Sequence, residues 1–177
     1  MVLYIFIEAL WLILPAYAAN GMAPLFKGTH PLDGGRLLRD KPLFGPGKTW
    51  EGFFFGCVIA TFIGFLQMSV MSNLPFATSP VPLLIVGMSP LLGFLLGFGA
   101  MFGDLVGSFI KRRIGMPRGA PVPVLDQVDF LLGAFVFALI LSPIRWEWVI
   151  LMLILTPIFH LIANSVGYAI GLSKTWY

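Results

Sequence analysis

Long runs of apolar residues alternate with short polar connections along almost the whole chain, which predicts helices that cross a membrane. A helix needs about 20 mostly apolar residues to span the hydrocarbon core of a bilayer. None of the runs shows the strand-length alternation of an outer-membrane barrel. We therefore expect an all-α integral membrane protein, a bundle of five transmembrane helices. The five segments are residues 1–20, 50–71, 82–107, 126–144 and 147–170.

The composition supports this class. Of the 177 residues, 58% are hydrophobic and 11% are charged, too few charges to cover the surface of a soluble globule. The first run lacks a basic leader and a clear cleavage site, so we expect a retained helix rather than a removed signal peptide. Cys57 is the single cysteine, which leaves no disulfide framework. One transmembrane domain is expected over residues 1–177, without a nucleic-acid partner.

The cations are concentrated in two long loops. The connection over residues 21–49 has five of them and the connection over residues 108–125 has four, whereas the remaining turns between apolar runs hold only Arg145. Loops rich in Lys and Arg tend to stay in the cytoplasm. We therefore expect a cell-membrane protein with two long cytoplasmic loops, a cytoplasmic C-terminus and an external N-terminus.

Three carboxylates, Asp104, Asp126 and Asp129, flank the second of these loops. If the fourth helix begins near Leu125, Asp126 and Asp129 lie three residues apart on one face of its first turn, where they repel each other unless a cation joins them. A hard divalent ion such as Mg²⁺, bound by few carboxylates and completed by phosphate oxygens, fits such a site. In the structural alternative, Asp126 caps the helix and Asp129 complements its dipole.

A hydroxyl group and cations accompany the carboxylates. If the third helix continues past Gly107, then Asp104, Ser108 and Lys111 fall at i, i+4 and i+7 on one face. The next turn is rich in Gly and Pro, which end the helix. That turn would hold Arg118 over the site, so the carboxylates and cations would share one cytoplasmic face.

The first loop ends in Gly47, Lys48 and Thr49, which resemble the end of a phosphate-binding P-loop. That motif requires a Gly where this chain has Pro42, and no buried strand precedes it, so we reject it. Thr49 can still cap the second helix, with the free backbone N–H groups on the side of Lys48. An anion site and a plain cap beside a solvated lysine are equal alternatives here.

Some polar residues within the apolar runs are candidates for a functional or structural role. Glu8, near the external end, is expected to be a structural partner or interfacial rather than functional, although a carboxylate in a spanning helix is a functional candidate by default. Asn20 lies at the cytoplasmic end of its run, as a helix C-cap or a ligand contact. His160 is expected to be a hydrogen-bonded bundle residue, and Asn164, one turn later, points to the cytoplasmic end.

Four stretches together resemble the CDP-archaeol synthase family, the archaeal relatives of CDP-diacylglycerol synthases. The resemblance extends over nearly the whole chain. It rests on LPAYAAN in the first run, PLDGGRLLRDKPLFGPGKTWEG in the first loop, GDLVGSFIKRR followed by LDQVDF, and HLIANSVGYAIGL near the end. It implies a cytidylyltransferase that joins CTP to an isoprenoid glycerophosphate lipid with Mg²⁺, giving CDP-archaeol and pyrophosphate.

The resemblance also implies roles for single residues. Asp104, Asp126 and Asp129 match the metal-binding carboxylates, and Lys111 with Arg112 matches a cation pair. From their charge and their place at the cytoplasmic face, the candidates for nucleotide and phosphate binding are Lys48, Thr49, Ser108, Arg112, Arg118, Asn20 and Asn164.

The chain departs from the bacterial signature between these motifs. Residues 120–124 replace its Pro-Gly-His-Gly-Gly, and Pro117 and Arg118 replace its acidic-basic pair. The roles of the replaced residues therefore do not carry over.

Two rival functions differ in class. Another Mg²⁺-dependent membrane lipid or prenyl transferase would use Asp pairs at the same face, but usually two Asp-rich motifs and more spans. A small membrane transporter could use intramembrane polar residues as an ion path. No inverted repeat is visible and the charge lies at one face, which favours a site open to one side.

Overall fold

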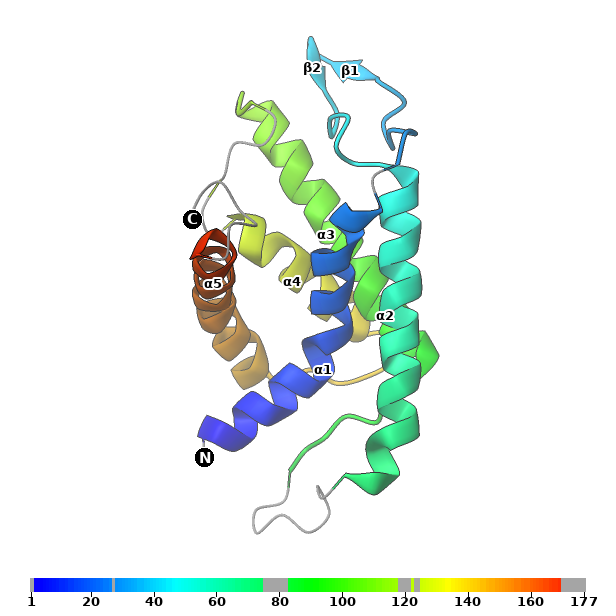
Figure 1. Ribbon diagram of the computed structural model, residues 1–177, viewed down its shortest axis with the longest axis vertical. Coiled ribbons are helices and arrows are strands. Elements are labelled where there is room, and N and C mark those ends of the chain that lie inside the picture. Colours follow the sequence, from blue (N-terminus) through cyan, green and yellow to red (C-terminus); the bar gives the residue numbers. More distant parts are fainter. Residues whose placement is uncertain (1, 27, 75–82, 118–121, 123–124, 170–177) are drawn as a thin grey trace.

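The computed structural model describes residues 2–26, 28–74, 83–117, 122 and 125–169. Five α-helices make up most of this part of the chain, which confirms the all-helical class (Figure 1). Their bounds are α1 Val2–Met22, α2 Trp50–Val70, α3 Pro90–Arg113, α4 Leu125–Ala138 and α5 Trp146–Ala169. Short 3₁₀ turns, η1 at Ala23–Leu25 and η2 at Met71–Asn73, follow α1 and α2.

Three helical segments are long and apolar enough to cross a membrane. They are Val2–Leu25, Trp50–Asn73 and Pro90–Arg113, each 24 residues long. α4 has 14 residues. Its length is about 21 Å at ~1.5 Å per residue, less than a ~30 Å hydrocarbon core. The apolar part of α5 within the described residues, Trp146–Ile162, is also short. Five spanning helices therefore remain a prediction.

Two helix boundaries differ from the sequence prediction. α3 begins at Pro90 instead of near residue 82, because the Ser89 hydroxyl caps it by accepting a hydrogen bond from the Leu92 N–H at 3.1 Å. α4 ends at Ala138 instead of residue 144, and the chain turns before Pro143. Apolar composition alone did not separate these extended and turning segments from helix.

The first loop contains a small hairpin of two antiparallel strands, β1 (Leu37–Leu38) and β2 (Lys41–Pro42). Figure 1 shows it at the end of the bundle where α2 begins and α3 ends. The guanidinium of Arg113, in the last turn of α3, ties the hairpin down. It donates hydrogen bonds to the carbonyl oxygens of Leu38, Lys41 and Pro42.

α3 packs closely against two neighbours through glycine. A Cβ atom on Gly103 would fall on the backbone carbonyl of Asp129 in α4, and one on Gly133 would lie 3.0 Å from the Gly103 Cα. On the α2 side, a Cβ on Gly93 would lie 3.0 Å from the Gly64 Cα. The predicted small-residue packing seam is therefore real, and it brings α4 against the segment that carries Asp104.

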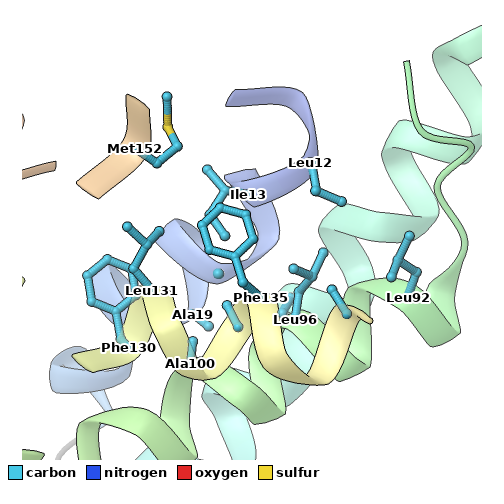
Figure 2. Packing of buried hydrophobic residues seen from close by; sticks show 14 of the residues in the cluster. Leu12, Ile13, Ala19, Leu92, Leu96, Ala100, Phe130, Leu131, Phe135 and Met152 are labelled. Atoms are coloured by element: carbon cyan, nitrogen blue, oxygen red, sulfur yellow. The ribbon is translucent and has the colours of Figure 1, made fainter. Parts of the chain in front are cut away.

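The remaining contacts are apolar. Figure 2 shows Leu12 and Ile13 of α1, Leu96 of α3, Leu131 of α4 and Met152 of α5 in one cluster, each of them fully buried. α1 thus touches α3, α4 and α5, while α4 packs mainly against α3.

Glu8 organises the opposite end of the bundle from the hairpin. Its side chain is buried and accepts hydrogen bonds from Arg145 Nη1 at 3.2 Å, Trp148 Nε1 at 2.9 Å and the Leu84 N–H at 2.7 Å. Arg145 also contacts Glu147 at 2.9 Å. Glu8 is therefore a structural partner, as expected, that joins α1, the segment before α3 and α5.

Candidate active site

The end of α3 places three candidate side chains on one face. The helix continues through Gly107 to Arg113, so the predicted alignment of Asp104, Ser108 and Lys111 is confirmed. Ser108 is buried, whereas the other two side chains reach a cavity. Of the three, Asp104 and Lys111 are thus available to a ligand.

Lys48 approaches Asp104 from the first loop. Its ammonium group lies 2.5 Å from Asp104 Oδ2. The next residue, Thr49, caps α2 by accepting a hydrogen bond from the Gly52 N–H at 3.3 Å, which confirms the predicted cap. The loop therefore delivers a cation and a helix N-terminus to the carboxylate of α3.

Lys111 pairs with Asp126 in the same way. The Lys111 ammonium lies 2.5 Å from Asp126 Oδ1, while Oδ2 accepts a hydrogen bond from the Val122 N–H at 3.1 Å. α4 begins at Leu125, as predicted, so Asp126 is in its first turn. Its carboxylate both orders the approach to α4 and holds the α3 lysine.

Asp129 is the third carboxylate, and it lies between α3 and α4. A Cβ atom on Gly107 would clash with its Oδ2. Oδ1 accepts a hydrogen bond from the Phe130 N–H at 2.6 Å, but Oδ2 is buried and has no hydrogen-bond partner within the described part of the chain. Asp104, Asp126 and Lys111 are the charged groups that interact with it.

The sequence analysis expected neighbouring carboxylates to repel each other unless a cation joins them. In the structure Lys48 holds Asp104 and Lys111 holds Asp126, while Asp129 still lies beside both carboxylates. Within the described ranges, no three His, Cys, Asp or Glu side chains are close enough together to bind a metal ion. Mg²⁺ commonly takes one or two carboxylates and completes its shell with water and substrate phosphates. The orphaned Asp129 Oδ2 is an oxygen donor of this kind, so the residues fit Mg²⁺ bound together with a substrate.

The two ion pairs border a cavity of about 730 Å³ between the first loop and the ends of α1, α2 and α3. This volume is large enough for a small-molecule ligand. Six of the predicted residues line it: Asn20, Lys48, Thr49, Asp104, Lys111 and Asp126.

Other predicted residues lie elsewhere. Arg112 lines a separate cavity of about 300 Å³ with Lys41, and its Nη2 donates to the Pro117 carbonyl at 3.2 Å. Arg118 and the side chain of Asn164 lie outside the described residues.

Some cavity residues were not predicted. His160, expected to be a hydrogen-bonded bundle residue, is exposed and lines the cavity from α5. Phe26 and Phe53 line it as well. The spacing of His160 one turn before Asn164 near the cytoplasmic end was a signal for this placement, whereas nothing in the pattern distinguished the two Phe residues from lipid-facing ones.

A cavity bordered by Lys–Asp pairs at one end of an apolar helical bundle can receive phosphate groups, because Lys ammonium groups form charge-assisted hydrogen bonds with phosphate. Comparison with known proteins gives the family. The model of the CarS-like CDP-archaeol synthases matches residues 2–177, so the chain belongs to the CDP-archaeol synthase family.

Individual relatives agree along nearly their whole lengths. The chain is 41% identical to the CDP-archaeol synthase of Methanococcoides burtonii, covering 92% of this chain and 98% of that protein. It is 44% identical to the one from Thermococcus onnurineus, covering 92% of both. A solved structure described as an intramembrane enzyme for archaeal membrane lipids biosynthesis superposes with a TM-score of 0.76 at 34% identity, covering 89% of this chain and 93% of that one.

Proposed function

We propose that this chain is a CDP-archaeol synthase, a cytidylyltransferase of archaeal phospholipid biosynthesis. It transfers CMP from CTP to 2,3-bis-O-(geranylgeranyl)-sn-glycerol 1-phosphate, giving CDP-archaeol and pyrophosphate. Beyond family membership, the observation that carries the proposal is the cavity in which Lys48 and Lys111 face Asp104 and Asp126. Such a cavity can receive several phosphate groups next to the bilayer, where the lipid substrate resides.

The reaction depends more on stabilising negative charge on the phosphate groups than on transferring a proton. An oxygen of the lipid phosphate attacks the α-phosphorus of CTP. The bond between that phosphorus and the oxygen bridging to the β-phosphate breaks, and the electron pair leaves with pyrophosphate. A phosphate monoester is largely ionised at neutral pH because its second pKa is about 6. The protein must therefore bring two anions together and stabilise the charge that develops between them.

The two lysines can exchange partners to do this. In the structure each ammonium lies on a carboxylate, and phosphate oxygens of CTP would take over these contacts as charge-assisted hydrogen bonds. The Asp104 and Asp126 carboxylates would be released in this way. One or two of the Asp104, Asp126 and Asp129 carboxylates would then hold Mg²⁺ together with substrate phosphates. When bound, Mg²⁺ supplies positive charge to the transferring phosphoryl group.

The other candidates take supporting roles in this proposal. Thr49 presents the N-terminus of α2 to a phosphate, and Asn20 offers an amide at the cavity wall. Arg112, Arg118 and Asn164 are kept as nucleotide-binding residues, with Arg112 acting from the neighbouring cavity. Ser108 would act from its buried position by orienting its helical neighbours.

We also propose that the chain is one domain with five spanning helices. The site faces the cytoplasm and the N-terminus lies outside. The hairpin loop and the end of α3 both lie at the end of the bundle that carries the site, as this topology requires (Figure 1). A Cys57→Ala protein carrying Arg36→Cys would resist an impermeant thiol reagent in intact cells, whereas one carrying Trp146→Cys would react. Labelling of position 36 from outside would overturn the orientation.

Activity itself is tested with purified protein in detergent. Labelled CTP and the isoprenoid glycerophosphate should give labelled CDP-lipid only when Mg²⁺ and both substrates are present. A variant carrying both Lys48→Ala and Lys111→Ala is the matched control for contaminating activity. Transfer of a prenyl group instead, or no use of CTP, would reject the proposal in favour of the rival classes.

A further inference from the structure

Asp33 is a buried carboxylate in the first loop that does not line the large cavity. Its Oδ1 accepts a hydrogen bond from the Gly35 N–H at 2.9 Å. Its Oδ2 accepts two more, from the Phe44 N–H at 3.1 Å and the Gly45 N–H at 2.9 Å. One side chain therefore connects two parts of the loop that are eleven or more residues apart in sequence.

The backbone around Asp33 is built for this contact. Gly34 and Gly35 have φ values of 55° and 74°, which turn the chain back after Asp33, and Gly45 has a φ of 95°. Residues with side chains rarely adopt such angles. A Cβ atom on Gly45 would meet nothing within 4 Å, so what this position requires is the backbone angle and not space.

The residues beside Asp33 also hold the turn that carries Lys48. The Lys48 N–H donates to the Gly45 carbonyl at 3.1 Å, which closes a turn over residues 45–48. The Leu32 N–H donates to the Lys48 carbonyl at 2.8 Å. Asp33 thus binds the first residue of this turn, Gly45, and Leu32 binds the last one, Lys48. The Lys48 side chain extends from the turn to Asp104, with Nζ 2.5 Å from Oδ2.

We propose that Asp33 is a positioning residue for the nucleotide site: it fixes the turn over residues 45–48 and thereby sets Lys48 over Asp104. It acts through Lys48 and touches neither substrate. The kinetic part of this inference rests on the proposed function, because it takes CTP as the ligand of Lys48. The structural part, that the carboxylate orders the turn, holds independently of the substrate.

Asp33 is charged when it does this. Burial alone would raise its pKa, but the backbone N–H groups of Gly45, Gly35 and Phe44 outweigh that effect and lower the pKa below its usual value. Asp33→Asn removes the charge and turns an amide NH₂ or a weaker acceptor toward these N–H groups. The change keeps the size of the side chain, so it tests the contact without opening a cavity.

The matched control is Asp40→Asn. Asp40 is an exposed aspartate of the same loop, at the tip of the hairpin, with a φ of 61° that Asn tolerates. Gly45→Ala is a second variant that loosens the same turn by backbone strain, and it keeps the test decisive if Asp33→Asn folds poorly.

The first measurement is amide hydrogen exchange by mass spectrometry, which needs no activity. Exchange over residues 43–48 should rise in Asp33→Asn and Gly45→Ala, with α2 and α3 unchanged and Asp40→Asn like the original protein. Unchanged exchange over residues 43–48 in both variants would overturn the proposal that Asp33 orders this turn, whether or not the protein uses CTP.

The second measurement is a double-mutant cycle on the CTP dependence. Asp33→Asn should raise the KM for CTP about tenfold, with the lipid KM and kcat changed much less. In a Lys48→Ala background the same substitution should add less than about twofold, because the residue it positions is already gone. A merely structural Asp33 would lower thermal stability and give the same factor in both backgrounds, which would overturn its positioning role.

Discussion

The two ends of the bundle each hold a cluster of charged residues, and the two clusters are built differently. At the Glu8 end, the carboxylate has three donors, one from the segment before α3 and two from the start of α5, so both of its oxygens are satisfied. At the cavity end, two Lys–Asp contacts stand beside the Oδ2 of Asp129, which has no hydrogen-bond partner among the residues that the structure describes. A saturated cluster ties segments together, whereas one with spare capacity can change partners when a ligand arrives. The comparison assigns stability to the first cluster and chemistry to the second.

The largest expected effect is at the cavity end. Replacing Asp104, Asp126 or Asp129 by Asn removes one charge while keeping size, so each variant should fold and lose at least about 100-fold in turnover. Its Mg²⁺ dependence should shift to higher concentration. The measurement is activity per folded molecule across a Mg²⁺ titration. Normal values for Asp126→Asn and Asp129→Asn would remove the metal assignment and leave these residues a structural role.

Glu8→Gln should show the opposite behaviour. It removes the buried negative charge that Arg145 Nη1, Trp148 Nε1 and the Leu84 N–H contact, so the protein should unfold at a lower temperature. Thermal unfolding in detergent measures this loss. Turnover per folded molecule should stay within about twofold of the original protein. A loss of turnover without a change in stability would contradict the assignment of a structural role to the Glu8 cluster.

A smaller effect is expected for the cations of the site. Lys48→Ala, Lys111→Ala and Arg118→Ala should each raise the KM for CTP, or lower kcat/KM, by about 10- to 30-fold with little change in lipid dependence. Arg36→Ala is the control, an exposed cation of the same loop. Unchanged CTP dependence in all three variants would mean that the cluster sets membrane orientation or attracts anionic lipid instead.

The smallest effect concerns pH. The pKa of Asp33 is lowered in the folded loop, so its contribution to stability is present above the ordinary carboxyl value and is lost as the pH falls through the lower one. Amide protection at Phe44 and Gly45, corrected for intrinsic exchange, should therefore hold from pH 7 to about pH 5 and fail only below about pH 4. Loss of protection already at pH 6 would show that another group holds the loop.

Much of the fold followed from local pattern. The apolar runs gave five helices, and Thr49 caps α2 as predicted. The start of α3 was misplaced because residues 83–89 are apolar yet extended, and their backbone groups bond to other segments: the Leu84 N–H bonds to Glu8. Local propensity carries no information about such a distant partner.

The sequence analysis identified residues of the site but not which of them contact each other. Lys48 and Asp104 are 56 residues apart, and their contact depends on how the first loop folds over α3. The separation of Lys111 from Arg112, in contrast, could have been predicted. Adjacent helical residues point about 100° apart, which turns the two long side chains toward different surroundings. The Asp-Gly-Gly sequence beginning at Asp33 was likewise a readable turn signal.

The glycine contacts between α3 and α4 have a mechanical consequence. Where Gly103 and Gly133 bring the backbones together, the helices have no layer of side chains between them whose repacking would let them slide. The carboxylates of Asp104 and Asp129 therefore lie on two helices, α3 and α4, that form a nearly rigid unit. By the same argument Gly93 and Gly64 lock α3 to α2, so heating or thinning of the bilayer should tilt α5 sooner than it changes the spacing of these two carboxylates.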